Sequence, residues 1–259
     1  MRIATWNVNS VNARLETVLA WLGEHQPDVA CFQEIKCVDE KFPREPFESL
    51  GYNVETYGQK SYNGVALLSK LPISDVRKGL PGDPSDEQAR YIEAVIEAPR
   101  PVRVGGLYLP NGNPLGTEKF AYKLGWFDRL NAHARDLLTL EEAFVLCGDY
   151  NVIPTPDDAR DPSAWTDDAL FQPESRAAFR SLCNLGLSDS HALGQEPAGT
   201  YTFWDYQAGA WQRDHGIRID FHLLSPQAAD RFAGIRTHRQ AREMDKPSDH
   251  VPVVVTLED

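Results

Sequence analysis

The segment Val145-Leu146-Cys147-Gly148-Asp149-Tyr150-Asn151 joins a short apolar run to a glycine, a carboxylate and an amide. An apolar run of this length that ends in Gly is typical of a buried strand whose end opens onto a cleft. Residues two apart on an extended backbone point to the same side, so Asp149 and Asn151 are expected to face one bound group together. The same letters also fit an ordinary Asx turn after a strand, and the segment alone does not separate the two interpretations.

A strand, a helix and a second strand are predicted at the start of the chain. Residues 2–8 form the first strand, residues 13–25 carry apolar side chains at helical spacing, and residues 29–33 form a buried strand. A strand–helix–strand unit of this length makes the two strands parallel. Their carboxyl ends then lie side by side, which brings Asn7 close to Glu34.

Apolar patterns predict further strands and two more helices in the rest of the chain. The predicted strands span residues 52–57, 65–69, 90–97, 102–109, 201–204, 217–224, 231–236 and 251–257, and the predicted helices span residues 117–140 and 173–185. Residues 71–88 and 153–171 are expected to be loops because Pro, Gly and Asp recur in them. No repeat or linker divides the chain, so residues 1–259 are expected to form one domain with helices packed outside stacked sheets.

The formal charge of the 259-residue chain is −12, from 26 basic and 38 acidic residues. This balance argues against nucleic-acid binding through overall charge, because Lys and Arg must lie where phosphates are neutralised. It leaves room for a local basic face on an acidic body. Residues that bind a cation also contribute to the acidic count.

Cysteine usage and the amino terminus indicate where the protein works. Four cysteines show no CxxC spacing, and Cys31 and Cys147 lie within apolar runs, as small core residues do. Reduced cysteines of this kind are typical of a cytoplasmic protein. No signal peptide precedes the first predicted strand, and no apolar run approaches membrane-spanning length, so a soluble cytoplasmic protein is expected.

Polar side chains collect where the predicted strands end. An Asp within an apolar strand is costly to bury unless it is paired or holds a metal, so Asp220 needs a partner. His250, beside Asp249 and just before the last strand, is a candidate base, since a carboxylate-held His is a common proton-transfer arrangement. Each residue alone also fits a structural role. A purely structural role is less favoured for Asp149, Asp220 and His250 taken together, because three separate strand ends would then carry polar groups by coincidence.

The oxygen-rich set suits a hard cation such as Mg²⁺, which binds one or two carboxylates and keeps several waters. Glu34 is the best single ligand and Asn7 a suitable neutral one. Zinc is disfavoured because the chain has no HExxH motif and no Cys/His cluster, and no Walker loop, GxGxxG or GxSxG motif occurs. The remaining chemistry is metal-assisted hydrolysis of a phosphate ester by water or hydroxide.

Seven short blocks occur in order from end to end of the chain. They are Thr5-Trp6-Asn7-Val8-Asn9, Gln33-Glu34-Ile35-Lys36, Asn63-Gly64-Val65-Ala66, Leu107-Tyr108-Leu109-Pro110-Asn111-Gly112, Gly148-Asp149-Tyr150-Asn151, Arg218-Ile219-Asp220 and Pro247-Ser248-Asp249-His250. With these blocks the chain resembles the exonuclease III family of abasic-site DNA repair endonucleases, within the wider endonuclease/exonuclease/phosphatase superfamily. Each block is a weak signal alone, whereas the ordered set is specific and covers essentially the whole chain.

The resemblance implies an α/β fold of four layers, with two stacked mixed sheets flanked by helices. It implies a hydrolase that cuts the phosphodiester 5′ to abasic sites, with 3′-to-5′ exonuclease and 3′-end-clearing activity. The implied cofactor is Mg²⁺, with Mn²⁺ as a substitute, and the implied partner of this monomer is double-stranded DNA with abasic sites or blocked 3′ ends. Two alternatives stay open: a phosphoesterase of the same fold that acts on a non-DNA phosphate ester, and a non-catalytic binding protein.

The resemblance also assigns roles to individual residues. The implied metal-site residues are Asn7, Glu34, Asp149, Asn151 and Asp249, and the implied catalytic residues are Tyr108, Asp149, Asn151, Asp220 and His250. Among them Glu34 is the main metal ligand, Asp149 activates or positions the attacking water, and His250 contacts the phosphate oxygen. Some relatives carry Asp where this chain has Asn9, which leaves open whether one metal ion or two bind.

Contacts to DNA are implied for residues outside the catalytic set. Arg90 matches a position near the phosphate backbone, and Phe203, Trp204 and Ile219 resemble the wall of a pocket for an abasic sugar. Core packing is the alternative for Phe203 and Trp204. Trp211, at the tip of a polar excursion, is expected to wedge into a duplex, because inserted side chains help to unstack nucleotides. Three lysines are candidates for a basic strip, with solvated helix faces as the alternative: Lys60, Lys119 and Lys123.

Overall fold

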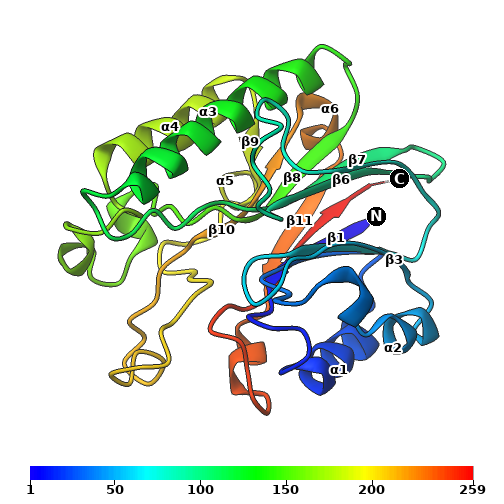
Figure 1. Cartoon of the computed structure of the whole chain (residues 1–259), viewed down its shortest axis with the longest axis horizontal. Coiled ribbons are helices and arrows are strands. Elements are labelled where there is room, and N and C mark those ends of the chain that lie inside the picture. Colours follow the sequence, from blue (N-terminus) through cyan, green and yellow to red (C-terminus); the bar gives the residue numbers. More distant parts are fainter. Residues whose placement is uncertain (259) are drawn as a thin grey trace.

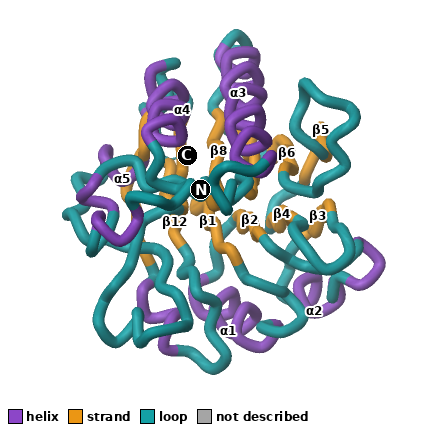
Figure 2. Tube along the Cα trace, turned by 60° about the vertical axis from the view of Figure 1, so that its left-hand side comes forward, coloured by secondary structure: helices purple, strands orange, loops and turns teal. Residues whose placement is uncertain are grey.

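Two mixed six-stranded sheets lie face to face, with helices on the outer surface of each (Figures 1 and 2). The computed structural model describes residues 1–258. The first sheet has the order β11 (Phe232–Thr237), β12 (Val253–Leu257), β1 (Arg2–Asn7), β2 (Val29–Gln33), β4 (Val65–Ser69) and β3 (Asn53–Tyr57). The second has the order β5 (Ile73–Lys78), β6 (Tyr91–Ile96), β7 (Val102–Tyr108), β8 (Phe144–Asp149), β10 (Asp220–Leu224) and β9 (Ser188–Asp189).

Helices cover both outer faces. On the first sheet lie α1 (Leu15–His25) and α2 (Arg44–Ser49), and on the second lie α3 (Glu118–Leu138) and α4 (Pro173–Asn184). The short helices α5 (Ser190–Leu193) and α6 (Pro226–Ala229) follow β9 and β10 along the chain, and the 3₁₀ turns span Asp39–Lys41, Pro156–Asp158, Pro162–Trp165 and Arg239–Glu243. Among the described residues, no helix combines the length and the apolar character that crossing a membrane requires.

Three apolar layers separate the four structural layers. Between the sheets pack small and branched residues such as Cys31 and Cys147, which are fully buried. Aromatic side chains fill the outer layers: Trp21 of α1 packs against the first sheet, and Trp126 of α3 packs against the second. Small and branched residues thus separate the two sheets, and large aromatic residues fill the space between each sheet and its helices. The predicted four-layer arrangement is confirmed.

The strand pairing decides which side chains meet. β1 and β2 are parallel, with Asn7 opposite Gln33, and β7 and β8 are parallel, with Tyr108 opposite Asp149. β10 runs antiparallel to β8 and places Asp220 opposite Asp149. Because the carboxyl ends of parallel strands meet at the same edge of a sheet, this register gathers the polar strand ends on one side of the molecule.

Four local features of the structure differ from the predictions. Residues 73–78 form the edge strand β5 rather than a loop, and the exposure of most of its side chains explains why no apolar pattern marks it. Residues 201–204 form no strand; Phe203 makes only isolated bridges to Ile217 and His250. β10 begins at Asp220, because the residues before it turn away to meet Phe203. The short helix α2 has a single buried residue, Phe47, and its sequence carries no helical period.

Replacing Gly148 by Ala is expected to destabilise the protein by about 2–3 kcal/mol or more, in the range of overpacked cores. A Cβ at this position would lie 1.9 Å from the carbonyl oxygen of Leu107, which belongs to the neighbouring strand and cannot move freely. Gly125→Ala is the matched control: its Cβ would meet nothing within 4 Å on α3. That change should stabilise by about 0.5–1 kcal/mol. Urea unfolding of both variants measures the difference, and an unchanged midpoint for Gly148→Ala would contradict the proposed clash.

Candidate active site

A pocket of about 240 Å³ opens where the polar strand ends converge. Its walls are Glu34, Tyr108, Asn111, Asp149, Asn151, Trp165, Asp168, Leu170, Phe203, Asp205, Ile219, Asp249 and His250. Residues from both sheets therefore face one space. Nearly all the polar residues that the sequence places at strand ends line this pocket or contact a residue that does.

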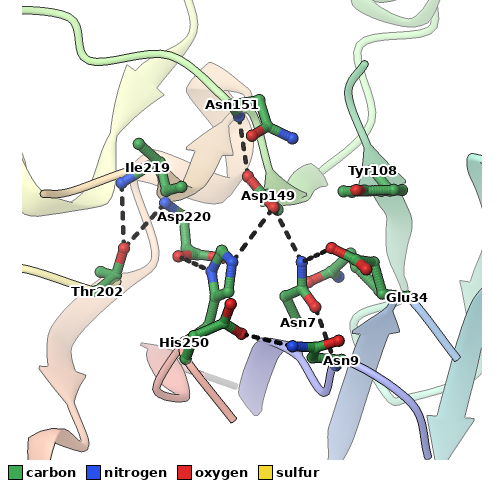
Figure 3. Close-up of polar contacts among 12 residues, drawn as sticks. Asn7, Asn9, Glu34, Tyr108, Asp149, Asn151, Thr202, Ile219, Asp220 and His250 are labelled. Carbon is green, nitrogen blue, oxygen red and sulfur yellow. Dashed lines mark hydrogen bonds and ion pairs between the residues drawn. The ribbon is translucent and has the colours of Figure 1, made fainter. Parts of the chain in front are cut away.

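Asp149 and His250 line the pocket, and Asp220 lies next to them as the partner of the imidazole (Figure 3). The ring nitrogen Nδ1 of His250 lies 2.9 Å from Oδ2 of Asp220, and Nε2 lies 3.6 Å from Oδ2 of Asp149. The exposed fractions of these side chains are 5% for His250, 2% for Asp149 and 0% for Asp220. The imidazole is thus held between two buried carboxylates.

Burial and charge act in opposite directions on His250. Burial lowers the pKa of the imidazole, but the carboxylates of Asp220 and Asp149 outweigh it and raise the pKa to about 10. Burial also raises the pKa of the Asp149 carboxyl, and the nearby charge of Asp220 raises it further against the opposing effect of His250. Near neutral pH, His250 is therefore a cation, and the Asp149 carboxyl, whose pKa is raised to about 7, exchanges its proton in the same pH range.

Asn7 joins the two acidic sides of the pocket. Its Nδ2 donates to Oε1 of Glu34 and to Oδ2 of Asp149, both at 3.0 Å. Burial alone would raise the pKa of Glu34, but hydrogen bonds from Asn7 and Lys36 lower it, and the Lys36 ammonium lies 2.8 Å from Oε2. Glu34 is therefore a carboxylate at neutral pH. Glu34 and Asp149 are thus bridged by one amide, and the contact of Asn7 with Glu34 is the one that the predicted βαβ unit requires.

The segment after β8 satisfies both interpretations of its sequence. The backbone N–H of Asn151 donates to Oδ1 of Asp149 at 2.9 Å, which is an Asx turn. Asn151 has φ +45°, and its Nδ2 donates to the carbonyl of Leu109 at 2.8 Å. Both Asp149 and Asn151 also line the pocket. The turn is the means by which the two side chains come to face the same space.

Tyr108 lines one wall of the site, and Arg90 packs against it. Burial raises the pKa of the Tyr108 hydroxyl well above its usual value, and the charges of Glu34 and Asp149 raise it further, so this hydroxyl is a hydrogen-bond donor. The Arg90 guanidinium lies over the Tyr108 ring at 4.8 Å and donates to the Tyr108 carbonyl at 3.2 Å. Arg90 is thus beside the pocket without lining it.

Asp249 lies at the pocket rim, apart from the buried group. Its Oδ1 accepts from Nδ2 of Asn9 at 3.1 Å, and Lys36 contacts the Asn9 side chain from the other direction at 2.5 Å. The donor set of Glu34, Asp149, Asp249 and the neighbouring amides consists of oxygens, which fits a hard divalent cation. Asp149, Asp220 and His250 also have one ligand atom each within 4.8 Å of one another.

Two of the three residues that were predicted to form the wall of the sugar pocket line this cavity. Phe203 and Ile219 line the cavity, and their neighbours there include Trp165 and Leu170. Trp204 does not: its side chain is 0% exposed, and its Nε1 donates to Asp214 at 3.0 Å. Trp204 is a core residue, which corrects its assignment to the pocket wall.

Trp211 and Lys123 also differ from expectation. Trp211 is half-buried, packs edge-on against Trp204 at 4.9 Å, and has the Arg239 guanidinium over its ring at 4.5 Å. It anchors the excursion, whose exposed stretch is residues 205–209, so Trp211 is not placed to wedge into a duplex. Lys123 is fully buried, so it belongs to no surface strip, and the same burial lowers its pKa to about 7.

Five pocket residues were absent from the predicted site set: Asn111, Trp165, Asp168, Leu170 and Asp205. Asn111 was noted as a strand-end amide, and its Nδ2 donates to Oδ1 of Asn151 at 3.3 Å. The other four come from a short 3₁₀ turn or from loops, where no period marks an inward-facing side chain. Only the seven-block order, which includes Asn111, could have identified one of them.

Comparisons with known proteins agree with this geometry. Residues 4–250 match the model of the Endonuclease/Exonuclease/phosphatase family. Exodeoxyribonuclease III of Haemophilus influenzae is 34% identical over 98% of both chains. A solved AP endonuclease from Archaeoglobus fulgidus is 36% identical with a TM-score of 0.94, and the 3′ phosphatase NExo from Neisseria bound to a product DNA hairpin is 38% identical with a TM-score of 0.95. Both structures are covered over 100% of both chains. The chain therefore belongs to the Endonuclease/Exonuclease/phosphatase family, and its resemblance to the exonuclease III group is confirmed.

Proposed function

We propose that the protein is a DNA repair hydrolase that cuts the phosphodiester 5′ to abasic sites, with 3′-to-5′ exonuclease and 3′-end-clearing activity. The observation that carries this proposal is the buried Asp149–His250–Asp220 group, which lies beside the amide-bridged carboxylate of Glu34 in one pocket. A cation, a proton-accepting carboxylate and a second acidic group are the components that phosphate-ester hydrolysis requires. The full-length match to exodeoxyribonuclease III supports DNA as the substrate.

The proposed cofactor is Mg²⁺, with Mn²⁺ as a substitute. Glu34 would hold it, with Asn7, Asp149, Asn151 and Asp249 as the neighbouring oxygen donors. When bound, the ion neutralises charge on the phosphate and lowers the pKa of water.

The side chains have separable roles in this proposal. Protonated His250 offers its Nε2–H to a non-bridging phosphate oxygen as negative charge develops there, while Asp220 holds the ring through Nδ1. Asp149 orients the attacking water and accepts its proton, which its raised pKa favours. Tyr108 and Asn151 donate hydrogen bonds that fix the scissile phosphate. Catalysis then rests on positioning and on fixed charges that the buried site need not reorganise.

The proposed partner is double-stranded DNA with an abasic site or a blocked 3′ end, bound by a monomer. Phe203 and Ile219 give the pocket an apolar wall next to the phosphate-binding groups, as an abasic sugar without its base requires. Arg90 at the pocket edge is the proposed backbone contact.

A labelled duplex with one synthetic abasic site should be incised only when Mg²⁺ or Mn²⁺ is present. A second, intact duplex with a recessed 3′ end measures the exonuclease in the same experiment. Glu34→Gln should reduce kcat/KM on the abasic duplex about a hundredfold or more, since the main metal-binding carboxylate becomes neutral. Glu40→Gln, an exposed acid six positions later, is the matched control and should keep wild-type kinetics.

Metal-independent cutting would contradict the proposed cofactor. No cutting of either duplex under any metal would contradict DNA as the substrate, and hydrolysis of a small phosphate ester by the same preparation would then favour the non-DNA phosphoesterase.

The charge on His250 is open to direct measurement by NMR of labelled imidazoles in metal-free protein. With a pKa of about 10, His250 should remain protonated from pH 6 to 8, whereas buried His222, whose pKa is lowered to about 3, should remain neutral and serve as the internal control. Asp220→Asn removes the principal stabilising charge and should lower the pKa of His250 by about one to three units.

The same shift predicts how stability depends on pH. The pKa of His250 is raised above the ordinary value of 6.5, so its contribution to the free energy of unfolding is complete below about pH 6.5 and is lost as the pH rises through about 10. Asp220→Asn should flatten the stability curve over this window, as measured by urea unfolding at several pH values. A His250 resonance that titrates near pH 6.5 in the wild type would contradict the buried ion pair.

A further inference from the structure

Lys123 is a fully buried lysine on the inner face of α3. Its Nζ donates to three backbone carbonyl oxygens: those of Pro110 at 3.1 Å, Asn111 at 3.1 Å and Asn151 at 2.5 Å. An ammonium group has three donors, and burying it is costly unless they are satisfied. Here every donor has an acceptor, and each acceptor is a carbonyl of a loop that borders the pocket.

These carbonyls belong to two separate connections. Pro110 and Asn111 follow β7, and Asn151 follows β8, so one ammonium group fastens together the ends of two adjacent parallel strands. The side chains of the same two asparagines line the pocket and meet there, with Nδ2 of Asn111 3.3 Å from Oδ1 of Asn151. The lysine therefore holds the backbone from behind while the amides project forward.

Gly112 provides independent support, because it makes the space that the lysine occupies. Gly112 has φ +89°, and a Cβ there would lie 2.6 Å from Cδ of Lys123 and 3.2 Å from Cβ of Ala169. The Lys123 stem thus passes directly beside a backbone position that carries no side chain. Asn151, held by the same ammonium, also has a left-handed backbone, with φ +45°. Non-glycine residues rarely adopt this conformation without supporting contacts.

We propose that Lys123 is a positioning residue for phosphodiester hydrolysis, which fixes the backbone at Asn111 and Asn151 so that their amides face the scissile phosphate. The inference rests on the proposed function, because it assumes that a phosphate binds in this pocket. Lys123 itself is behind the loops and touches no reacting atom. Its contribution is geometric, and displacements of about 1 Å at such groups cost up to about a hundredfold in rate.

The test is a double-mutant cycle on the abasic duplex. Lys123→Met keeps the length of the stem and removes the donors, and it should lower kcat about tenfold to a hundredfold with a smaller change in KM. Asn151→Gly removes the amide and tolerates the left-handed backbone. If Lys123 acts through Asn151, Lys123→Met should cost much less in the Asn151→Gly protein than in the wild type. If the Lys123 side chain supports only the fold, the fold-losses in kcat of the two single variants should multiply in the double variant.

Three further proteins complete the design. Arg135→Met removes an exposed cation from the same helix and should leave kcat and KM unchanged. Lys123→Arg, which restores charge and donors, should recover part of the rate lost in Lys123→Met. Gly112→Ala displaces the Lys123 stem while keeping the ammonium group, so it replaces Lys123→Met in the cycle if that variant does not fold. Its loss in kcat should be smaller than that of Lys123→Met, and smaller again in the Asn151→Gly protein.

The outcomes are distinguishable. If the wild-type protein incises the abasic duplex but the losses in kcat of the two single variants multiply in the double variant, the positioning role is overturned and the proposed function stands. A wild-type protein that cuts no abasic duplex would overturn both. We expect the wild-type protein to incise the abasic duplex, the double variant to lose less kcat than the product of the two single losses, and Lys123→Arg to recover part of the rate.

Discussion

Two carboxylates, Asp149 and Asp220, are buried opposite each other on adjacent antiparallel strands, and a cation between them is what makes that register tolerable. Like charges at this separation oppose ionisation, and burial strengthens the effect. Protonated His250 faces one carboxylate with each ring nitrogen, at 2.9 and 3.6 Å. Removing His250 leaves two buried carboxylates without their cation, which is far more costly than losing the group as a whole.

His250 reaches this position only because the two sheets pack against each other. Asp149 and Asp220 belong to the second sheet, whereas His250 precedes β12 of the first. Its backbone is tied to β1 by the indole of Trp6, which donates to the His250 carbonyl at 3.0 Å, and Ser248 donates to the Asn7 carbonyl at 2.7 Å. The active site is therefore a seam between the sheets, and the apolar layer that joins them also sets the distances between the catalytic groups.

Local sequence patterns predicted the features that depend on local spacing. Parallel strands follow from the βαβ spacing, so the meeting of Asn7 with Glu34 could be predicted from apolar periodicity alone. Burial that depends on distant segments could not. A tryptophan in a polar stretch looks the same whether it projects into solvent or packs as Trp211 does against Trp204. Likewise, nothing in the sequence distinguishes Lys123 from Lys119, the other lysine of α3; the carbonyls of two loops that bind Lys123 do.

The charges around the pocket explain why a net charge of −12 says little about the substrate. Five carboxylates line the pocket, those of Glu34, Asp149, Asp168, Asp205 and Asp249, and that of Asp220 lies directly behind His250. The cationic groups beside them are fewer: Lys36, His250 and Arg90, with Lys123 behind the loops. The pocket therefore carries excess negative charge before a substrate enters. A phosphodiester adds negative charge, and hydrolysis adds more, so the site as built is short of positive charge at the moment of reaction. A divalent cation at Glu34 offsets that shortfall where the oxygen donors are already gathered.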